Sequence, residues 1–130
     1  MNLNKKIILG GAQFGMKYGI ANKNGEISSK DLNEILNYAI NRKVYIIDAA
    51  TSYQRSLEKI FNFSKNSKFK KKIKVIIKIK STSILNPVKF KKFYDRYNIY
   101  CLMAHSSELF LKKSFQEKIK ILKNNYKFKL

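Results

Sequence analysis

Cysteine, proline and glycine are scarce in this sequence of 130 residues. Cys101 is the only cysteine, Pro87 is the only proline, and there are five glycines. A single thiol excludes an intramolecular disulfide and a thiolate metal site, so we expect no metal and a reducing cytoplasm as the compartment. Because no stretch rich in Pro, Gly or Ser divides the chain, we expect one domain over residues 1–130.

Long apolar runs are also missing. The stretch Ile7, Ile8, Leu9 is far too short for the core of a signal peptide, and nowhere do about 18 uninterrupted apolar residues occur that could cross a bilayer. The hydrophobic content of 45%, with 13% aromatic residues, is nevertheless ample for a packed core. These features predict a soluble, cytoplasmic protein that has no membrane segment.

Acidic residues and arginines are few. The chain has 28 basic and 8 acidic residues, a formal net charge of +20. Such a charge can attract nucleic acid or anionic lipid, so a basic binding module is one alternative function. Only Arg42, Arg55 and Arg96 are arginines, and the other 25 basic residues are lysines. Because base-edge and bidentate phosphate recognition usually depends on arginine, we expect a solvated basic surface and no specific nucleic-acid site.

Short apolar runs alternate four times with longer segments of helical period. We expect strands at Lys6 to Leu9, Val44 to Asp48, Ile73 to Ile79 and Tyr100 to Ala104. Helices are expected after a cap at Ser28 with Asp31, from Ser56 to Phe63, after Asn86 and Pro87, and around Phe115, Ile119 and Leu122. This alternation predicts an α/β fold, a parallel (β/α) barrel of the TIM type truncated to about four βα units.

A doubly wound open sheet is the alternative fold for such an alternation. That class usually carries a glycine fingerprint for phosphate after its first strand. Gly10, Gly11, Gly15 and Gly19 do not have the required spacing, and no GK[ST] sequence occurs. The glycines therefore favour the barrel.

Four polar residues lie at or just after the ends of the expected strands. Asp48 ends the second strand, Tyr53 follows in the same loop, Lys78 is near the end of the third strand, and His105 follows the fourth. Active sites of parallel barrels lie at this end. An ammonium beside a phenol favours the phenolate, which makes Tyr53 a candidate general acid. Each residue alone could be structural, but their joint place on three consecutive strands favours a site.

Four segments carry a family resemblance. In this order and at these spacings, ILGGAQFGMKYGIANKNGEIS, YIIDAATSY, VIIKIKS and CLMAHSS resemble the first half of the aldo/keto reductase family. Asp48 to Tyr53 in YIIDAATSY is the strongest element. The opening segment more narrowly resembles bacterial members that are associated with sugar and surface-polysaccharide metabolism.

The resemblance implies a chemistry and a role for each residue. Tyr53 would protonate a substrate carbonyl while a hydride arrives from NADPH, Lys78 with Asp48 would tune its acidity, and His105 would orient the carbonyl oxygen. NADP(H) would contact Asp48 and the backbone near Gly11 and Ala12. Lys80 is the alternative lysine, because it shares a strand face with Lys78.

The sequence departs from the family pattern at two positions and in its length. Gln54 stands where the family usually has glycine, and Ser107 stands where it usually has proline. Later strands, which supply most of the family's cofactor contacts, are missing.

We therefore weigh two hypotheses beside the binding module. One is a reductase of small carbonyl substrates that is inactive alone and works only when a second copy or a complementing half-barrel completes it. The other is a truncated, non-catalytic remnant.

Overall fold

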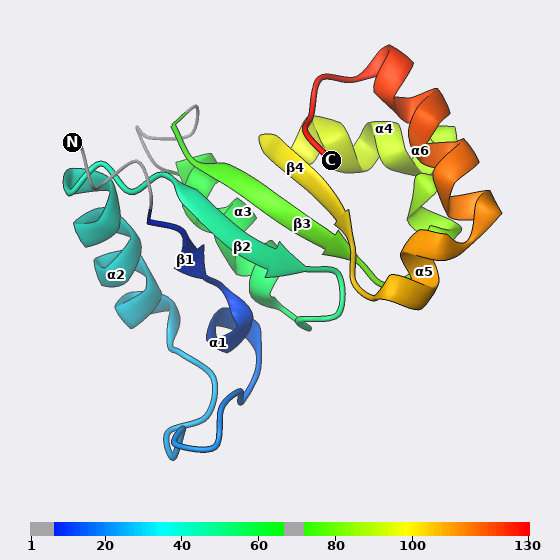
Figure 1. Ribbon diagram of the computed structural model, residues 1–130. Helices are drawn as coiled ribbons and strands as arrows, with labels where there is room; N and C mark the ends of the chain where they lie inside the picture. The colour runs from blue at the N-terminus through cyan, green and yellow to red at the C-terminus, as the bar shows by residue number, and fades with distance from the viewer. Residues whose placement is uncertain (1–6, 67–71) are drawn as a thin grey trace.

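The computed structural model describes residues 7–66 and 72–130. Within them, four parallel strands form one sheet in the order β1-β2-β3-β4 (Figure 1). The strands are β1 (Leu9–Gly10), β2 (Ile46–Ala50), β3 (Lys74–Ile79) and β4 (Ile99–Ala104). A doubly wound sheet reverses its strand order at a switch point, whereas a barrel adds each strand beside the previous one. The sequential order therefore agrees with the barrel that the sequence predicts.

Helices alternate with these strands. They are α1 (Ala12–Gly15), α2 (Ser29–Asn41), α3 (Ser56–Asn66), the 3-10 helix η2 (Thr82–Leu85), α4 (Pro87–Arg96), α5 (Ser107–Leu111) and α6 (Lys113–Asn125). Two predicted caps are confirmed: Ser28 accepts a hydrogen bond from the Asp31 backbone, and Asn86 caps α4, whose first residue is Pro87. No helix in the described ranges is long and apolar enough to cross a membrane.

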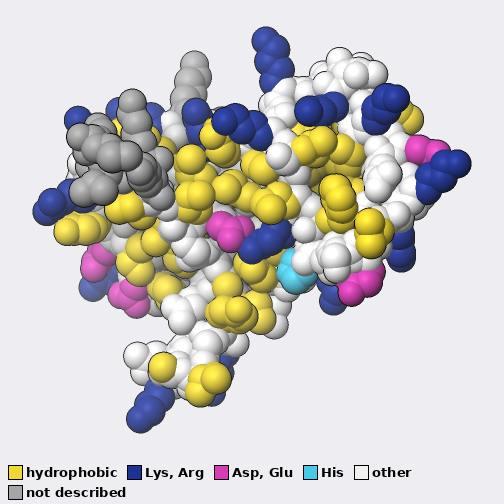
Figure 2. Space-filling model, viewed as in Figure 1, with side chains coloured by type: hydrophobic (Ala, Val, Ile, Leu, Met, Phe, Trp, Pro, Cys, Tyr) yellow, Lys and Arg dark blue, Asp and Glu magenta, His cyan; other side chains and the backbone are white. Residues whose placement is uncertain are grey.

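The two faces of the sheet differ in their surroundings. Side chains on one face are buried beneath the helices: Ile47, Ala49, Val75, Ile77, Ile79, Ile99 and Leu102. Side chains on the other face are half-buried or exposed: Ile46, Asp48, Ile76, Lys78, Cys101 and Met103. Figure 2 shows hydrophobic side chains gathered over the strands on this open face. In a closed barrel the same face would point inward.

The first two strands differ from the sequence prediction by two or more residues, and the third and fourth by one residue. The first strand was expected at Lys6 to Leu9. Lys6 lies outside the described residues, and the observed strand is Leu9–Gly10. The second begins two residues later than expected, because Lys43 has a φ of 62° and the Val44 backbone N–H still bonds to Ala39 of α2 at 2.9 Å. Val44 therefore belongs to the helix terminus, and Asp48 lies in the middle of β2 rather than at its end.

The last residues of the chain return to the edge of β4. Lys129 forms a parallel bridge with Cys101, accepting from Leu102 N at 2.8 Å and donating to Tyr100 O at 2.9 Å. Phe90 of α4 holds this segment from the helix side, with its ring centroid 5.1 Å from that of Tyr126 and 5.8 Å from that of Phe128. The segment thus takes the place of a fifth strand.

We expect Phe90→Ala to lower the free energy of unfolding by about 3–5 kcal/mol, because Phe90 is fully buried and its loss leaves a cavity among aromatic rings. Val88→Ala in the same helix is the control. Val88 is 68% exposed, so its replacement should change stability by about 0.5 kcal/mol or less. Urea denaturation of both variants measures the difference, and equal losses would contradict the packing described above.

We also expect the 130-residue chain to self-associate, more strongly as salt increases. Its open sheet face is partly apolar, and Ile7 and Ile8 beside β1 are 50% and 48% exposed. The net charge of +20 opposes association by mutual repulsion, which salt screens. Sedimentation velocity from low to high ionic strength measures this, and a monomer at every salt concentration would refute it.

Candidate active site

An ion pair joins the two central strands on the open face of the sheet. Asp48 pairs with Ile76 in the β2–β3 register, and Ala50 pairs with Lys78. Asp48 and Lys78 therefore emerge on the same face, two register positions apart. The Lys78 ammonium donates to Asp48 Oδ2 at 2.9 Å. Their side chains are 23% and 36% exposed, for Lys78 and Asp48 respectively, so the pair is partly shielded from solvent.

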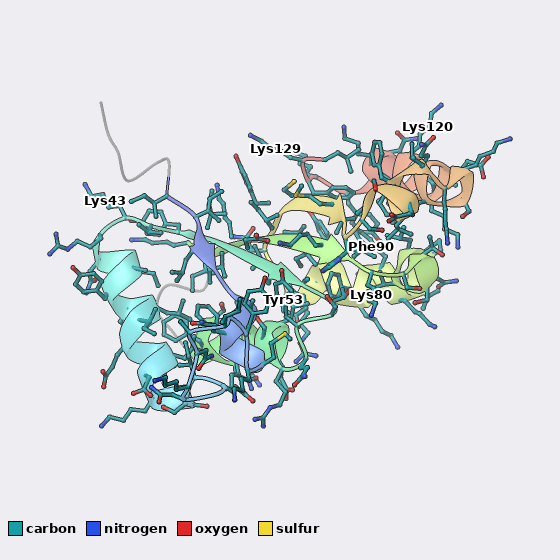
Figure 3. The ribbon with its side chains drawn as sticks, turned by 60° about the horizontal axis from the view of Figure 1, so that its bottom comes forward. Lys43, Tyr53, Lys80, Phe90, Lys120 and Lys129 are labelled. Carbon is teal, nitrogen blue, oxygen red and sulfur yellow. The ribbon has the colours of Figure 1, made fainter. Side chains whose placement is uncertain are left out.

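Tyr53 approaches this pair from the loop after β2. The loop is a tight turn, in which Tyr53 N bonds to Ala50 O at 3.1 Å and Ser56 N bonds to Tyr53 O at 2.8 Å. The turn places the Tyr53 ring centroid 5.4 Å from Lys78 Nζ. Tyr53 lies at the carboxyl ends of the strands, as Figure 3 shows.

His105 reaches the same place from the end of β4. Its backbone N–H donates to Ile79 O at 2.9 Å, which fixes the residue to the end of β3. Its ring meets the Tyr53 ring edge-on, with centroids 6.2 Å apart and an interplanar angle of 81°. The structure thus brings together all four residues that the sequence singled out.

The electrostatics of the cluster keep Lys78 charged. Burial acts to lower the pKa of Lys78, but hydrogen bonds with Asp48 and Tyr53 outweigh it, so the pKa is raised. A raised lysine pKa stabilises the fold below the ordinary lysine range, and the contribution is lost as pH rises through the raised value. At neutral pH Lys78 is therefore an ammonium beside the Tyr53 ring.

The two carboxylate oxygens of Asp48 differ in their hydrogen bonding. Its Oδ2 accepts from Lys78, whereas Oδ1 is buried and has no hydrogen-bond partner among the described residues. A buried acceptor without a donor is costly, and a hydroxyl group from a ligand would satisfy it. This oxygen is the feature of the site that best fits a cofactor or substrate.

Lys80, the alternative lysine, occupies a different position. It is exposed, and its backbone N–H donates to Thr51 Oγ1 at 3.1 Å. Figure 3 places it at the same end of the sheet as Tyr53. Since Lys78 makes the contacts with Asp48 and Tyr53, the geometry favours Lys78 for the role in acid–base chemistry.

Gly11 supports Asp48 through the backbone. Its N–H donates to Asp48 O at 2.8 Å, and its carbonyl accepts from the hydroxyl of the fully buried Ser56 at 2.7 Å. A Cβ on Gly11 would lie 3.0 Å from Asp48 O, so a larger residue would crowd β2. Ala12 begins α1 and is half-buried. The Gly11 N–H is already bonded to Asp48 O, so a cofactor could contact only the second lone pair of the Gly11 carbonyl or the backbone of Ala12. The cofactor contacts predicted near Gly11 and Ala12 stay a prediction.

Sequence reasoning missed three residues beside the site. Gly15 of α1 packs so closely on the Tyr53 loop that a Cβ there would lie 2.0 Å from Ser56 N. Tyr18 faces Tyr53 with ring centroids 6.4 Å apart. Thr51 bonds to the end of β3. Only the glycine carries a signal in the sequence, because the other two contacts depend on the path of a loop.

The comparison with protein families decides the membership of the chain. The sequence pattern of the Aldo/keto reductase family matches residues 6–127. The chain belongs to the aldo/keto reductase family. No curated protein matches the sequence.

Solved structures show the same fold. Two from Pseudomonas aeruginosa, both named as candidate aldo-keto reductases, superpose with a TM-score of 0.72 each, at 16% and 15% sequence identity. The superpositions cover 93% of this chain and 52% and 51% of theirs. This chain therefore spans about half the length of these structures, and its four parallel strands with their helices match half of an aldo/keto reductase barrel.

Ser107, which replaces the family's usual proline, lies at a helix start in this chain. Ser107 is the first residue of α5, and Ser106 caps that helix by accepting from Leu109 N at 3.3 Å. Proline is favoured at a first helical position because it needs no N–H partner there. Serine is accommodated at the same position, where it begins α5.

The departure at Gln54 has a physical cost. Gln54 follows Tyr53 with a φ of 40°, in the left-handed region where a side chain is strained and glycine is not. Aldo/keto reductases usually carry glycine at this place. Glycine would adopt the same backbone conformation without this strain.

We expect Gln54→Gly to raise the free energy of unfolding by up to about 1 kcal/mol, because glycine relieves the left-handed strain. Gln54→Ala is the matched control, since it removes the same side chain but keeps a Cβ. Urea denaturation of the two variants gives the comparison. A glycine variant that is less stable than the alanine variant would show that Gln54 is unstrained.

Proposed function

We propose that this chain supplies the acid–base half of a carbonyl reductase that uses NADPH to reduce an aldehyde or ketone. The supporting observation is the convergence of Asp48, in the middle of β2, with Tyr53, Lys78 and His105 near the carboxyl ends of the parallel strands. An ammonium held by a carboxylate and placed beside a phenol is an arrangement suited to donating a proton to an oxygen that gains charge.

Each side chain has a role in this proposal. Tyr53 donates its proton to the carbonyl oxygen, and the Lys78 ammonium stabilises the phenolate that remains. Asp48 holds Lys78 in place through the 2.9 Å ion pair. His105, whose ring meets Tyr53 edge-on, orients the carbonyl oxygen. Bound NADPH would supply the hydride, and Asp48 Oδ1, a buried acceptor without a partner among the described residues, is the group that would accept from one of its hydroxyls.

The proposal requires the other half of the barrel, which these 130 residues do not contain. β4 borders an open groove of about 570 Å³, lined mainly by apolar side chains that include Met103, Phe110 and Ile119. Lys129 already pairs with β4 in parallel register at one end of this groove. A complementing half-barrel, or a second copy of the chain, would continue that pairing and cover the open face.

The opening segment supports a proposal for the substrate class. Residues 8–28 form β1, α1 and the loop that carries Tyr18 beside Tyr53. Their resemblance to bacterial family members linked to sugar and surface-polysaccharide metabolism favours a carbonyl compound derived from a sugar. The Tyr18 ring, 53% exposed, offers such a molecule an apolar surface next to the proton donor.

We expect the 130-residue chain alone to show no measurable reduction of aldehydes by NADPH. Hydride transfer needs the nicotinamide about 3–3.5 Å from the carbonyl carbon, and such positioning supplies about 7–11 kcal/mol of the lowered barrier. General acid assistance from Tyr53 is typically worth about 10²–10⁴-fold and cannot act on a cofactor that is not held. NADPH oxidation with a panel of aldehydes measures this.

Tyr53→Phe is the control for contaminating reductases in that assay. It removes the proton donor and keeps the ring that packs beside Tyr18 and His105. Turnover by the unmodified chain that vanishes in Tyr53→Phe would show that the chain assembles a working site unaided. Equal turnover by the unmodified chain and by Tyr53→Phe would come from contaminating reductases of the expression host.

A further inference from the structure

Thr51 connects the Tyr53 loop to the end of β3. It is the first residue after β2, two residues before Tyr53. Its backbone N–H donates to Lys78 O at 2.9 Å, and its hydroxyl accepts from Lys80 N at 3.1 Å. The same hydroxyl lies 3.4 Å from Lys78 O, to which it can donate. One half-buried side chain thus holds both ends of the Lys78–Lys80 segment.

These bonds take the place of the backbone hydrogen bonds that β2 would have made to the end of β3 if the strand had continued past Ala50. The β2–β3 ladder ends where Ala50 pairs with Lys78, because β2 then turns away into the loop. The last peptide groups of β3 would be left without partners at that point. The Thr51 hydroxyl serves as the acceptor that a backbone carbonyl would have supplied, so the end of β3 stays fixed.

The position of Thr51 also couples the proton donor of the proposed reaction, Tyr53, to the Lys78 ammonium that stabilises its phenolate. Tyr53 N bonds to Ala50 O, so the turn that carries the phenol starts from the residue before Thr51. Lys78, which carries the ammonium, is bonded to Thr51 directly through its carbonyl. A shift of the loop against β3 would change the 5.4 Å separation between Lys78 Nζ and the Tyr53 ring.

We propose that Thr51 is a positioning residue, whose hydroxyl sets the spacing between the Lys78 ammonium and the Tyr53 phenol. The proposal rests on the function inferred above for that pair. In this role Thr51 acts through Lys78 and Tyr53 and not by contact with the substrate.

The test is the titration of Lys78, followed by NMR of 13C-labelled lysine in the full chain, with the Lys78 signal identified by its loss in Lys78→Met. Burial lowers the Lys78 pKa, while hydrogen bonds with Asp48 and Tyr53 raise it above the ordinary value. Asp48, Tyr53 and His105 are the titratable groups around it. In Thr51→Val, which keeps the shape but not the hydroxyl, we expect the Lys78 midpoint to move down.

Two further variants separate positioning from folding. Thr51→Ser keeps the hydroxyl and should keep the Lys78 midpoint of the unmodified chain. Thr82→Val changes a half-buried threonine at the start of η2 and should also leave the midpoint unchanged. Urea denaturation of each variant, run beside the titration, shows whether a moved midpoint belongs to a folded chain.

Three results would overturn the inference. An unchanged Lys78 midpoint in Thr51→Val, or a lowered one in Thr51→Ser, would show that the hydroxyl does not set the spacing. If Lys78 in the unmodified chain titrates like an ordinary lysine and is insensitive to Tyr53→Phe, the site itself is wrong and the inference on Thr51 is overturned with it. Only this third result would count against the proposed function.

Discussion

The parallel register between β2 and β3 places the two charged residues of the site. Because Asp48 pairs with Ile76 and Ala50 pairs with Lys78, Asp48 and Lys78 emerge on the same face at a diagonal, close enough for a 2.9 Å ion pair. A slip of one residue would turn one of the two side chains toward the helices. The face toward the helices is filled by buried side chains such as Ile47 and Ile77, and a charge without a partner would be costly there.

The same alternation divides the sheet into a structural face and a chemical face. Odd-numbered residues of β3 (Val75, Ile77, Ile79) pack under helices, and even-numbered ones (Lys74, Ile76, Lys78) lie on the open face. Burial on the first face supplies the hydrophobic stabilisation. The second face keeps the partly exposed polar groups that proton transfer needs, together with apolar surface that a closed barrel would cover.

Close backbone contacts then fix the loop that carries Tyr53. Gly11 bonds to Asp48 through its N–H and to Ser56 through its carbonyl, and Gly15 lies against the backbone of the residues after Tyr53. With Thr51 bonded to the end of β3, the loop is held from α1 on one side and from β3 on the other. The strained φ of Gln54 is tolerated within this support.

The sequence by itself determined the alternation of strands and helices, the helix starts at Ser28, Ser56 and Pro87, and the third and fourth strands to within one residue. Helical periodicity and capping depend on residues that are close together in the chain, so the sequence alone is enough to predict them. It also singled out Asp48, Tyr53, Lys78 and His105, because polar residues that interrupt or follow apolar runs stand out.

Tertiary structure alone decided which lysine contacts Asp48, since two lysines two residues apart share a strand face and only the register distinguishes them. It also decided the short helices α1, η2 and α5, which have too few residues for a helical period to be visible. The contacts of Thr51 and Ser56 join residues that are distant in the sequence. No local pattern encodes such contacts, because they arise only when β2, β3 and α1 are packed together.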